Sequence, residues 1–129
     1  MLHANHFELG TDRAWWLAQL AKAAQSRGED VAILRLAHFD NPIERTRLQA
    51  KFEAAGVDWS KVVYLVCSSA RALCKVHDYA SEHAGLLIAD IGWDGGPLVD
   101  VRAGTSGRSD ASAILQEIHE LPRMQVVFT

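Results

Sequence analysis

Short apolar runs alternate along the chain with segments whose apolar residues recur at helical spacing. The runs VAILRLAHF (31–39), KVVYLVC (61–67) and GLLIADIG (85–92) are rich in β-branched and aliphatic residues, and MQVVF closes the sequence as a further strand. Nearly continuous apolar runs are typical of parallel strands that are covered on both faces. After the WDGG turn, PLVDV (97–101) predicts a hairpin partner.

Helical segments separate these strands. The predicted helices cover about 12–27, Asn41-Pro42 to Gly56, the residues from Ser68 or Ser69 to about 83, and about 110–120. Gly28 ends the first of them. Strands that alternate with helices predict βαβ units. We therefore expect an α/β fold: one domain over residues 1–129, built as a three-layer sandwich with a mostly parallel sheet and helices on both faces.

Composition narrows the class of protein. The chain has 129 residues and a net charge of −3, which gives no general case for binding nucleic acid or an anionic membrane. No apolar run approaches the roughly 20 residues that span a bilayer. The N-terminal residues lack the pattern of a signal peptide. Cys67 and Cys74, without a CxxC motif, are typical of a reducing compartment, so we expect a cytoplasmic protein without a membrane partner.

Three segments carry a family resemblance. WLAQLAKAAQSRGEDVAIL has the layout of a helix and the strand after it. HFDNPIERTRLQAKFEAAGVDWSKVVYL joins an acidic stretch and a proline to an arginine-bearing helix, an AAG turn and a strand. LLIADIG ends near Asp90, like a Walker B strand. In this order and spacing, residues 7–129 resemble the RecA-like ATPase core, particularly that of plasmid replicative helicases.

The phosphate loop that such a core requires is degenerate. Residues 7–14, FELGTDRA, align with GxxxxGK[ST], and their one glycine, Gly10, falls on a variable position of that pattern. Asp12 replaces the glycine that lets backbone N–H groups close around the phosphates, and its carboxylate would repel them. Arg13 replaces the lysine, and Ala14 replaces the Ser/Thr that holds Mg²⁺. The cradle and the metal ligand are therefore both missing.

Other parts of the catalytic apparatus implied by the resemblance are also altered. The position of the catalytic glutamate falls on Phe39, with Asp40 one residue away, and Asp90 remains alone. Phosphoryl transfer needs the cradle, the metal and a positioned water together. Cell-division inhibitors and mutagenesis factors related to RecA but lacking its loop are a precedent for such chains. The resemblance therefore implies a non-catalytic interaction protein without a cofactor, with DNA metabolism as its setting by analogy. The alternative is an unrelated βαβ domain that never had this site.

Tryptophan residues are the candidate interface anchors. Trp15 and Trp16 are adjacent on a predicted helix, about 100° apart, so both cannot point squarely into one small core. Trp93 falls in a predicted turn. Exposed tryptophans recur at the centres of protein interfaces. We therefore expect a homo-oligomer that also binds a protein partner.

A rival interpretation is a small-ligand or nucleotide-binding protein, or an enzyme, with a non-standard site. Its parts would be Arg13, Asp90 and the Ser68-Ser69 start of the third helix. The N–H groups and hydroxyls of CSSAR (67–71), with Arg71, would bind an anion there. Ordinary capping by Ser69 is the interpretation that we favour for this segment.

Nucleic acid and metal ions are weaker alternatives. Arg45, Arg47 and Lys51 lie on the second predicted helix, and Arg102 and Arg108 flank a Gly/Ser-rich loop, but the loop has no aromatic residue to stack bases.

The possible metal ligands are His3, His6 and His38 with Asp40, and Asp90 with Asp94 and Asp100. The histidines have no recognised ligand spacing and Asp94-Gly95 suits a tight turn, so we expect no metal site. A Cys67 nucleophile with His77 as its base is disfavoured against a buried, inert cysteine.

Overall fold

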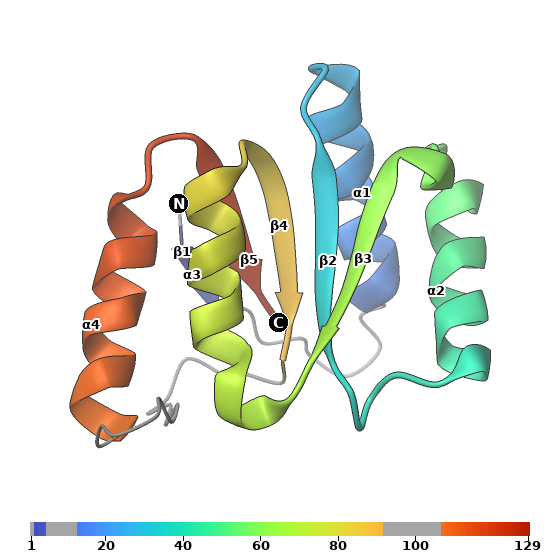
Figure 1. Cartoon of the computed structure of the whole chain (residues 1–129). Coiled ribbons are helices and arrows are strands. Elements are labelled where there is room, and N and C mark those ends of the chain that lie inside the picture. The colour runs from blue at the N-terminus through green and yellow to red at the C-terminus, as the bar shows by residue number, and fades with distance from the viewer. Residues whose placement is uncertain (1, 5–12, 92–106) are drawn as a thin grey trace.

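A parallel sheet organises the part of the chain that the computed structural model describes, which comprises residues 2–4, 13–91 and 107–129. The strands are β1 (Leu2–Ala4), β2 (Val31–Leu36), β3 (Val62–Cys67), β4 (Gly85–Asp90) and β5 (Met124–Phe128). Their order in the sheet is β1-β5-β4-β2-β3, and every neighbouring pair is parallel (Figure 1). The four parallel strands predicted from the apolar runs are confirmed. The hairpin strand predicted at 97–101 lies outside the described residues.

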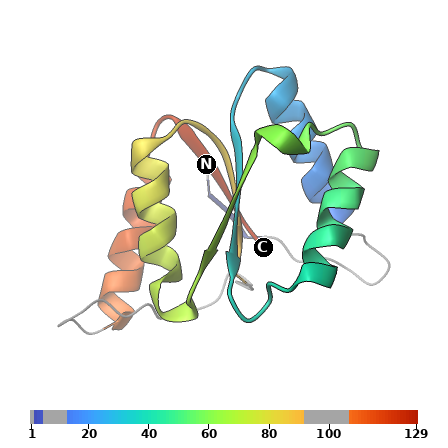
Figure 2. The same cartoon turned by 45° about the vertical axis from the view of Figure 1, so that its right-hand side comes forward.

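Helices cover both faces of this sheet. They are α1 (Arg13–Ser26), α2 (Pro42–Ala54), α3 (Ala72–Glu82) and α4 (Gly107–Glu120). With the sheet seen nearly edge-on, α1 and α2 lie on one side and α3 and α4 on the other (Figure 2). The predicted three-layer α/β sandwich is therefore confirmed. Within the described ranges, no helix has the length and apolar character needed to cross a bilayer.

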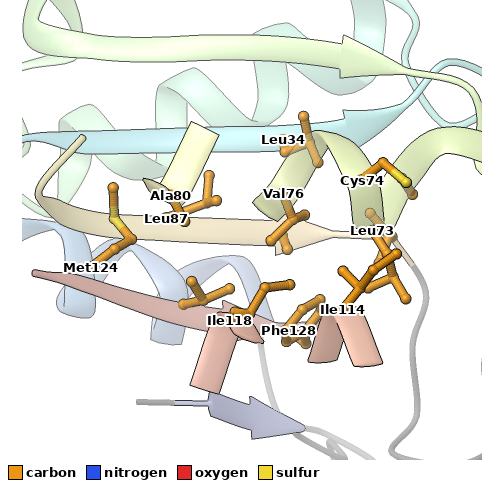
Figure 3. Packing of buried hydrophobic residues seen from close by; sticks show 14 of the residues in the cluster. Leu34, Leu73, Cys74, Val76, Ala80, Leu87, Ile114, Ile118, Met124 and Phe128 are labelled. Carbon is orange, nitrogen blue, oxygen red and sulfur yellow. The ribbon is translucent and has the colours of Figure 1, made fainter. Parts of the chain in front are cut away.

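The central strands explain why both faces need cover. All six residues of β2 and all six of β4 are buried. Successive side chains of a strand point to opposite faces, so Ile33 joins the core under α1 and α2 whereas Leu34 joins the core under α3 and α4. Figure 3 shows the second core, where Val76 of α3 and Ile118 of α4 lie with Leu87 of β4. Burying each such aliphatic side chain contributes about 1.5–3 kcal/mol.

The capping residue predicted from the sequence is found at the start of α2 but not at the start of α3. The side chain of Asn41 accepts a hydrogen bond from the Glu44 backbone N–H at 2.9 Å and caps α2. Pro42 is tolerated in the first turn because a backbone N–H at that position would have no partner within the helix. The cap predicted for α3 is wrong. A single 3₁₀ turn, η2 (Ser69–Arg71), follows Ser68, so α3 begins only at Ala72, with Arg71 as its N-cap and no side-chain capping bond.

Candidate functional site

The candidate site lies where β2 and β4 approach their carboxyl ends, on the face covered by α1 and α2. Arg35 of β2 is the register partner of Asp90, the last residue of β4. Arg35 lies two residues after Ile33, and Asp90 lies two residues after Ile88. Both isoleucines belong to the α1/α2 core, so Arg35 and Asp90 point to that same face. In parallel α/β sheets this edge is the usual place for ligand sites.

Two arginines hold the carboxylate of Asp90. Nε of Arg35 donates a hydrogen bond to Oδ2 at 2.9 Å, and both side chains are more than nine-tenths buried. Nη2 of Arg13, at the start of α1, lies 3.1 Å from Oδ1. This contact is an ion pair, and buried Oδ1 accepts no hydrogen bond from the described residues. The charge of Asp90 is thus balanced by two arginines: Arg35, whose side chain is buried, and Arg13, whose side chain is partly exposed.

A second layer of polar contacts surrounds this pair. The hydroxyl of Tyr64, on β3, donates to Oδ1 of Asp40 at 2.7 Å and lies 3.5 Å from Nη1 of Arg35. Arg45 of α2 donates to Asp40 Oδ2 at 2.6 Å, and its guanidinium lies 4.4 Å from the centroid of the Tyr64 ring. Asp40 therefore fixes the loop before α2 against both β3 and α2.

These contacts set the protonation states. Hydrogen bonds from Arg45 and then Tyr64 hold the pKa of Asp40 below its usual range. Burial and then the hydrogen bond to Asp40 raise the pKa of Tyr64. Burial would lower the pKa of Arg35, but the hydrogen bond to Tyr64 and the charge of Asp90 outweigh it, and the net change is upward. At neutral pH the network therefore has an anionic Asp40, a neutral Tyr64 and a cationic Arg35.

A cavity of about 310 Å³ opens beside these residues, between α1 and α2. Among the described residues, its charged lining includes the cations Arg13, Arg35, Arg47 and Lys51 and the carboxylates Glu44 and Asp90. Ala14, Leu17 and Leu48 supply the apolar wall. A neighbouring hollow of about 470 Å³ shares Arg13, Arg35, Glu44 and Asp90 with it and adds His38 and Phe39. We refer to the two together as the carboxyl-edge cavity.

The structure brings together only part of the ligand site predicted from the sequence. Arg13 and Asp90 meet as an ion pair and line the carboxyl-edge cavity. Ser68 follows β3 and precedes α3, which covers the opposite face of the sheet, and it is not among the described residues that line this cavity. The side chain of Ser69 lies outside what the structure describes. Ala14 of the degenerate loop also lines the cavity, whereas residues 7–12 of that loop lie outside the described residues.

Phe39 and Asp40, at the position of the missing glutamate, take different roles. Phe39 is 40% exposed and its ring lies against that of His38, with centroids 4.3 Å apart. Asp40 is occupied by Tyr64 and Arg45. Asp40 and Asp90 therefore each face an arginine.

The tryptophan pair on α1 divides between surface and core. Trp15 is 52% exposed, whereas Trp16 is partly buried and packs against the α1/α2 core. Trp93 lies outside the described residues. The fourth tryptophan, Trp59, packs edge-on against Phe52 with ring centroids 5.6 Å apart. The expectation that Trp15 and Trp16 cannot both point inward is confirmed.

The structure gives little support to the other candidate metal, catalytic and nucleic-acid-binding residues of the sequence analysis. Over the described residues, no group of three or more His, Cys, Asp or Glu side chains is placed to hold a metal ion. His77 lies 3.0 Å from Glu117 of α4, which makes it a link between two helices. Arg47 pairs with Glu44 at 3.3 Å. Asp94, Asp100 and Arg102 lie outside the described residues.

Sequence reasoning missed Arg35 and Tyr64. The signal was present for Arg35: one charged residue inside the apolar run VAILRL needs a partner when both faces of a strand are covered. Nothing comparable marked Tyr64, which reads as an ordinary strand residue. Comparisons with known protein families, curated proteins and solved structures found no match to this chain, so the geometry of the described residues carries the functional argument.

Proposed function

We propose that this chain is a non-catalytic interaction protein on a RecA-like frame, which self-associates and binds a protein partner in the cytoplasm. The observation that carries the non-catalytic part is the engagement of Asp90 by Arg35 and Arg13. A Walker B aspartate must be available to a hydrated Mg²⁺. Here its charge is balanced by guanidinium groups, which would repel the metal.

The position of Arg13 strengthens this argument. The resemblance sets Arg13 at the place of the phosphate-loop lysine, whose ammonium would contact the phosphates. In this chain the guanidinium is directed at Asp90, 3.1 Å away. Ala14 supplies no oxygen for a metal. Residues that would hold a nucleotide and its metal are thus replaced or paired with each other.

Nucleotide titration tests the non-catalytic part. We expect no ATP hydrolysis and no ATP affinity tighter than millimolar, with or without Mg²⁺. A ligand at one hundred times its dissociation constant stabilises a protein by about 2.7 kcal/mol, which a thermal shift detects easily. Micromolar binding of Mg-ATP that Asp90→Ala abolishes would overturn the proposal.

Exposed apolar side chains support the interaction part. Trp15, Phe39 and Ile43 are all substantially exposed and all belong to segments at the carboxyl edge of the sheet. Large apolar side chains that gather on one side of a protein are typical of interaction surfaces. Sedimentation over a range of protein concentrations tests self-association, and a strictly monomeric chain would contradict it.

A second candidate function is supported by a separate observation. Among the described residues, the carboxyl-edge cavity is lined by the cations Arg13, Arg35, Arg47 and Lys51 and the carboxylates Glu44 and Asp90, and Arg35 and Asp90 are buried. Such a lining suits a small anionic ligand more than a metal-nucleotide complex. The second candidate is therefore a small-ligand-binding protein whose site includes Arg13 and Asp90 at the carboxyl edge of β2 and β4.

A further inference from the structure

We infer that the outer edge of β3 binds an extended segment of a partner protein as one more strand of the sheet. This inference names a surface and a chemistry for the protein partner of the proposed function, and it rests on that part of the proposal. It does not depend on self-association or on nucleotide binding. The expected segment is about six residues long and alternates β-branched apolar side chains with polar ones.

The two edges of the sheet differ in what they offer to another strand. β1 forms one edge with three residues, Leu2–Ala4, and very short edge strands resist further pairing. β3 forms the other edge with six residues, all in unbroken register with β2 (Figure 1). Its sequence, VVYLVC, contains no charged residue and no proline. β3 therefore lacks the charges, prolines and bulges by which edge strands usually avoid pairing with another chain.

Backbone hydrogen-bonding groups point away from the sheet along β3. The carbonyl of Cys67 accepts a hydrogen bond from the Ala37 N–H at 2.8 Å, so the backbone groups of Cys67 face the side on which β2 lies. Successive residues of a strand direct these groups to opposite sides, so the N–H and C=O groups of Tyr64 and Val66 face outward. Within the described ranges, β3 pairs with β2 alone. The outward groups of Tyr64 and Val66 can therefore bond to an added strand.

Exposed apolar side chains accompany these backbone groups on both faces of the sheet. Val63 and Val66 are 42% and 40% exposed. Val63 lies two residues before Leu65, on the face covered by α3 and α4, and Val66 lies two residues after Tyr64, on the face covered by α1 and α2. An added strand would cover the open side of both valines. β-Branched side chains pack well on such a pleated surface, which indicates the character of the segment.

A single extended segment fits this edge better than a second copy of the chain does. Arg45 of α2 lies 4.4 Å from the centroid of the Tyr64 ring, so α2 covers β3 on one face. Antiparallel pairing with a second β3 would keep both α2 helices on that face, over strands about 4.8 Å apart. Packed helices need axes about 8–10 Å apart, so the two would collide. A strip about 20 Å long and one strand wide is also much smaller than the roughly 800 Å² that each partner buries in a stable interface.

A labelled peptide tests this inference. The probe is a fluorescein-labelled, C-terminally amidated hexapeptide of alternating threonine and valine, and its fluorescence anisotropy is followed as the protein is added. We expect saturable binding. The same hexapeptide with every backbone nitrogen methylated keeps the side chains but cannot donate main-chain hydrogen bonds, so it should bind at least about tenfold more weakly.

Hydrogen exchange followed by NMR locates the bound peptide. The unlabelled hexapeptide should slow the exchange of the Tyr64 and Val66 amide protons, because both face outward and would become paired. It should leave the amide proton of Leu65 unchanged, because that group already faces β2. Protection of these two amides in this pattern is the signature of an added strand.

Matched variants separate this edge from other surfaces. Val66→Pro removes an outward N–H without removing a bond to β2, since proline is tolerated on edge strands at such positions, and it should weaken peptide binding about tenfold. Val66→Thr keeps the N–H and the branched shape and should bind like the wild type. Trp15→Ser should also bind like the wild type, because α1 lies away from this edge. Circular dichroism and melting confirm folding, and the exchange pattern still decides the matter where Val66→Pro is unfolded.

Several results would overturn the inference: no saturable binding up to about 1 mM peptide, equal binding of the methylated peptide, protection of other amides in place of Tyr64 and Val66, or loss of binding in Trp15→Ser. Conversion of an oligomeric wild type to a monomer by Val66→Pro would also overturn it, because the edge would then hold a second copy. A monomeric chain that binds the peptide would contradict self-association alone, whereas an oligomer that does not bind it would contradict only this inference.

Discussion

Arg35 and Asp90 are register partners on neighbouring strands, and their buried side chains meet at 2.9 Å across the sheet. Burying two charges costs free energy that their attraction offsets only when the hydrogen bonding is good. Here Tyr64 and Arg13 supply the additional contacts. The pair therefore ties β2 to β4 at the edge where the cavity opens.

Removing one partner of this pair should be costly. Asp90→Ala leaves the Arg35 guanidinium buried without its carboxylate, and we expect a loss of about 3–5 kcal/mol in the free energy of unfolding. Arg35→Met combined with Asp90→Leu removes both charges and puts apolar side chains in their place, so the double variant should lose less than the sum of its single variants. Urea unfolding measures the wild type, Asp90→Ala, the single variants Arg35→Met and Asp90→Leu, and the double variant. Additive losses would show that the two residues are not energetically coupled.

The Asp40 contacts predict a pH dependence. A carboxyl whose pKa is lowered by folding contributes stability that is present above its unfolded pKa of about 3.9 and is lost as the pH falls towards its folded pKa. We expect the wild-type protein to lose stability between about pH 5 and pH 3 more steeply than Asp40→Asn does. Urea unfolding at stepped pH checks this. Glu82→Gln, which removes an exposed carboxyl at the end of α3, is the control and should follow the wild type.

The fold could be predicted from the sequence because its signals are local. Apolar runs marked β2 and β4, and Asn41-Pro42 marked the start of α2. Each of these rests on residues close together in the chain. The prediction of a cap for α3 was wrong because the 3₁₀ turn η2 follows Ser68 and delays the helix.

The candidate site was less predictable because its contacts are not local. Arg35 and Asp90 are separated by 55 positions in the chain, and their pairing follows from β2 lying beside β4 rather than from any motif. The apolar runs could not specify that strand order. Arg13 and Asp90 were identified through the resemblance, but as remnants of a nucleotide site, and the ion pair between them was not foreseen.

Two glycines at the amino edge of the sheet offer a matched pair of substitutions. Gly85 has φ of +121°, and a Cβ there would lie 2.3 Å from the backbone oxygen of Asp30. Gly28 has φ of +75° with open space around it. Gly28→Ala should cost about 1–2 kcal/mol for the left-handed backbone alone. Gly85→Ala should cost clearly more because the backbone must also move, and equal melting temperatures for the two variants would contradict this.

Trp15 gives the sharpest test of self-association. Its side chain is 52% exposed on α1, whereas the neighbouring Trp16 packs against the core, so a change at Trp15 can alter the surface without opening the interior. If Trp15 anchors an interface, Trp15→Ser should shift the protein towards monomer in sedimentation, because desolvating an aromatic ring stabilises a contact. Its melting point under monomeric conditions should stay near that of the wild type.

Val63→Ser, at an exposed position on the edge strand β3, is the control. Dissociation by Val63→Ser but not by Trp15→Ser would move the interface to the sheet edge, and a wild-type chain that stays monomeric at high concentration would remove the case for self-association.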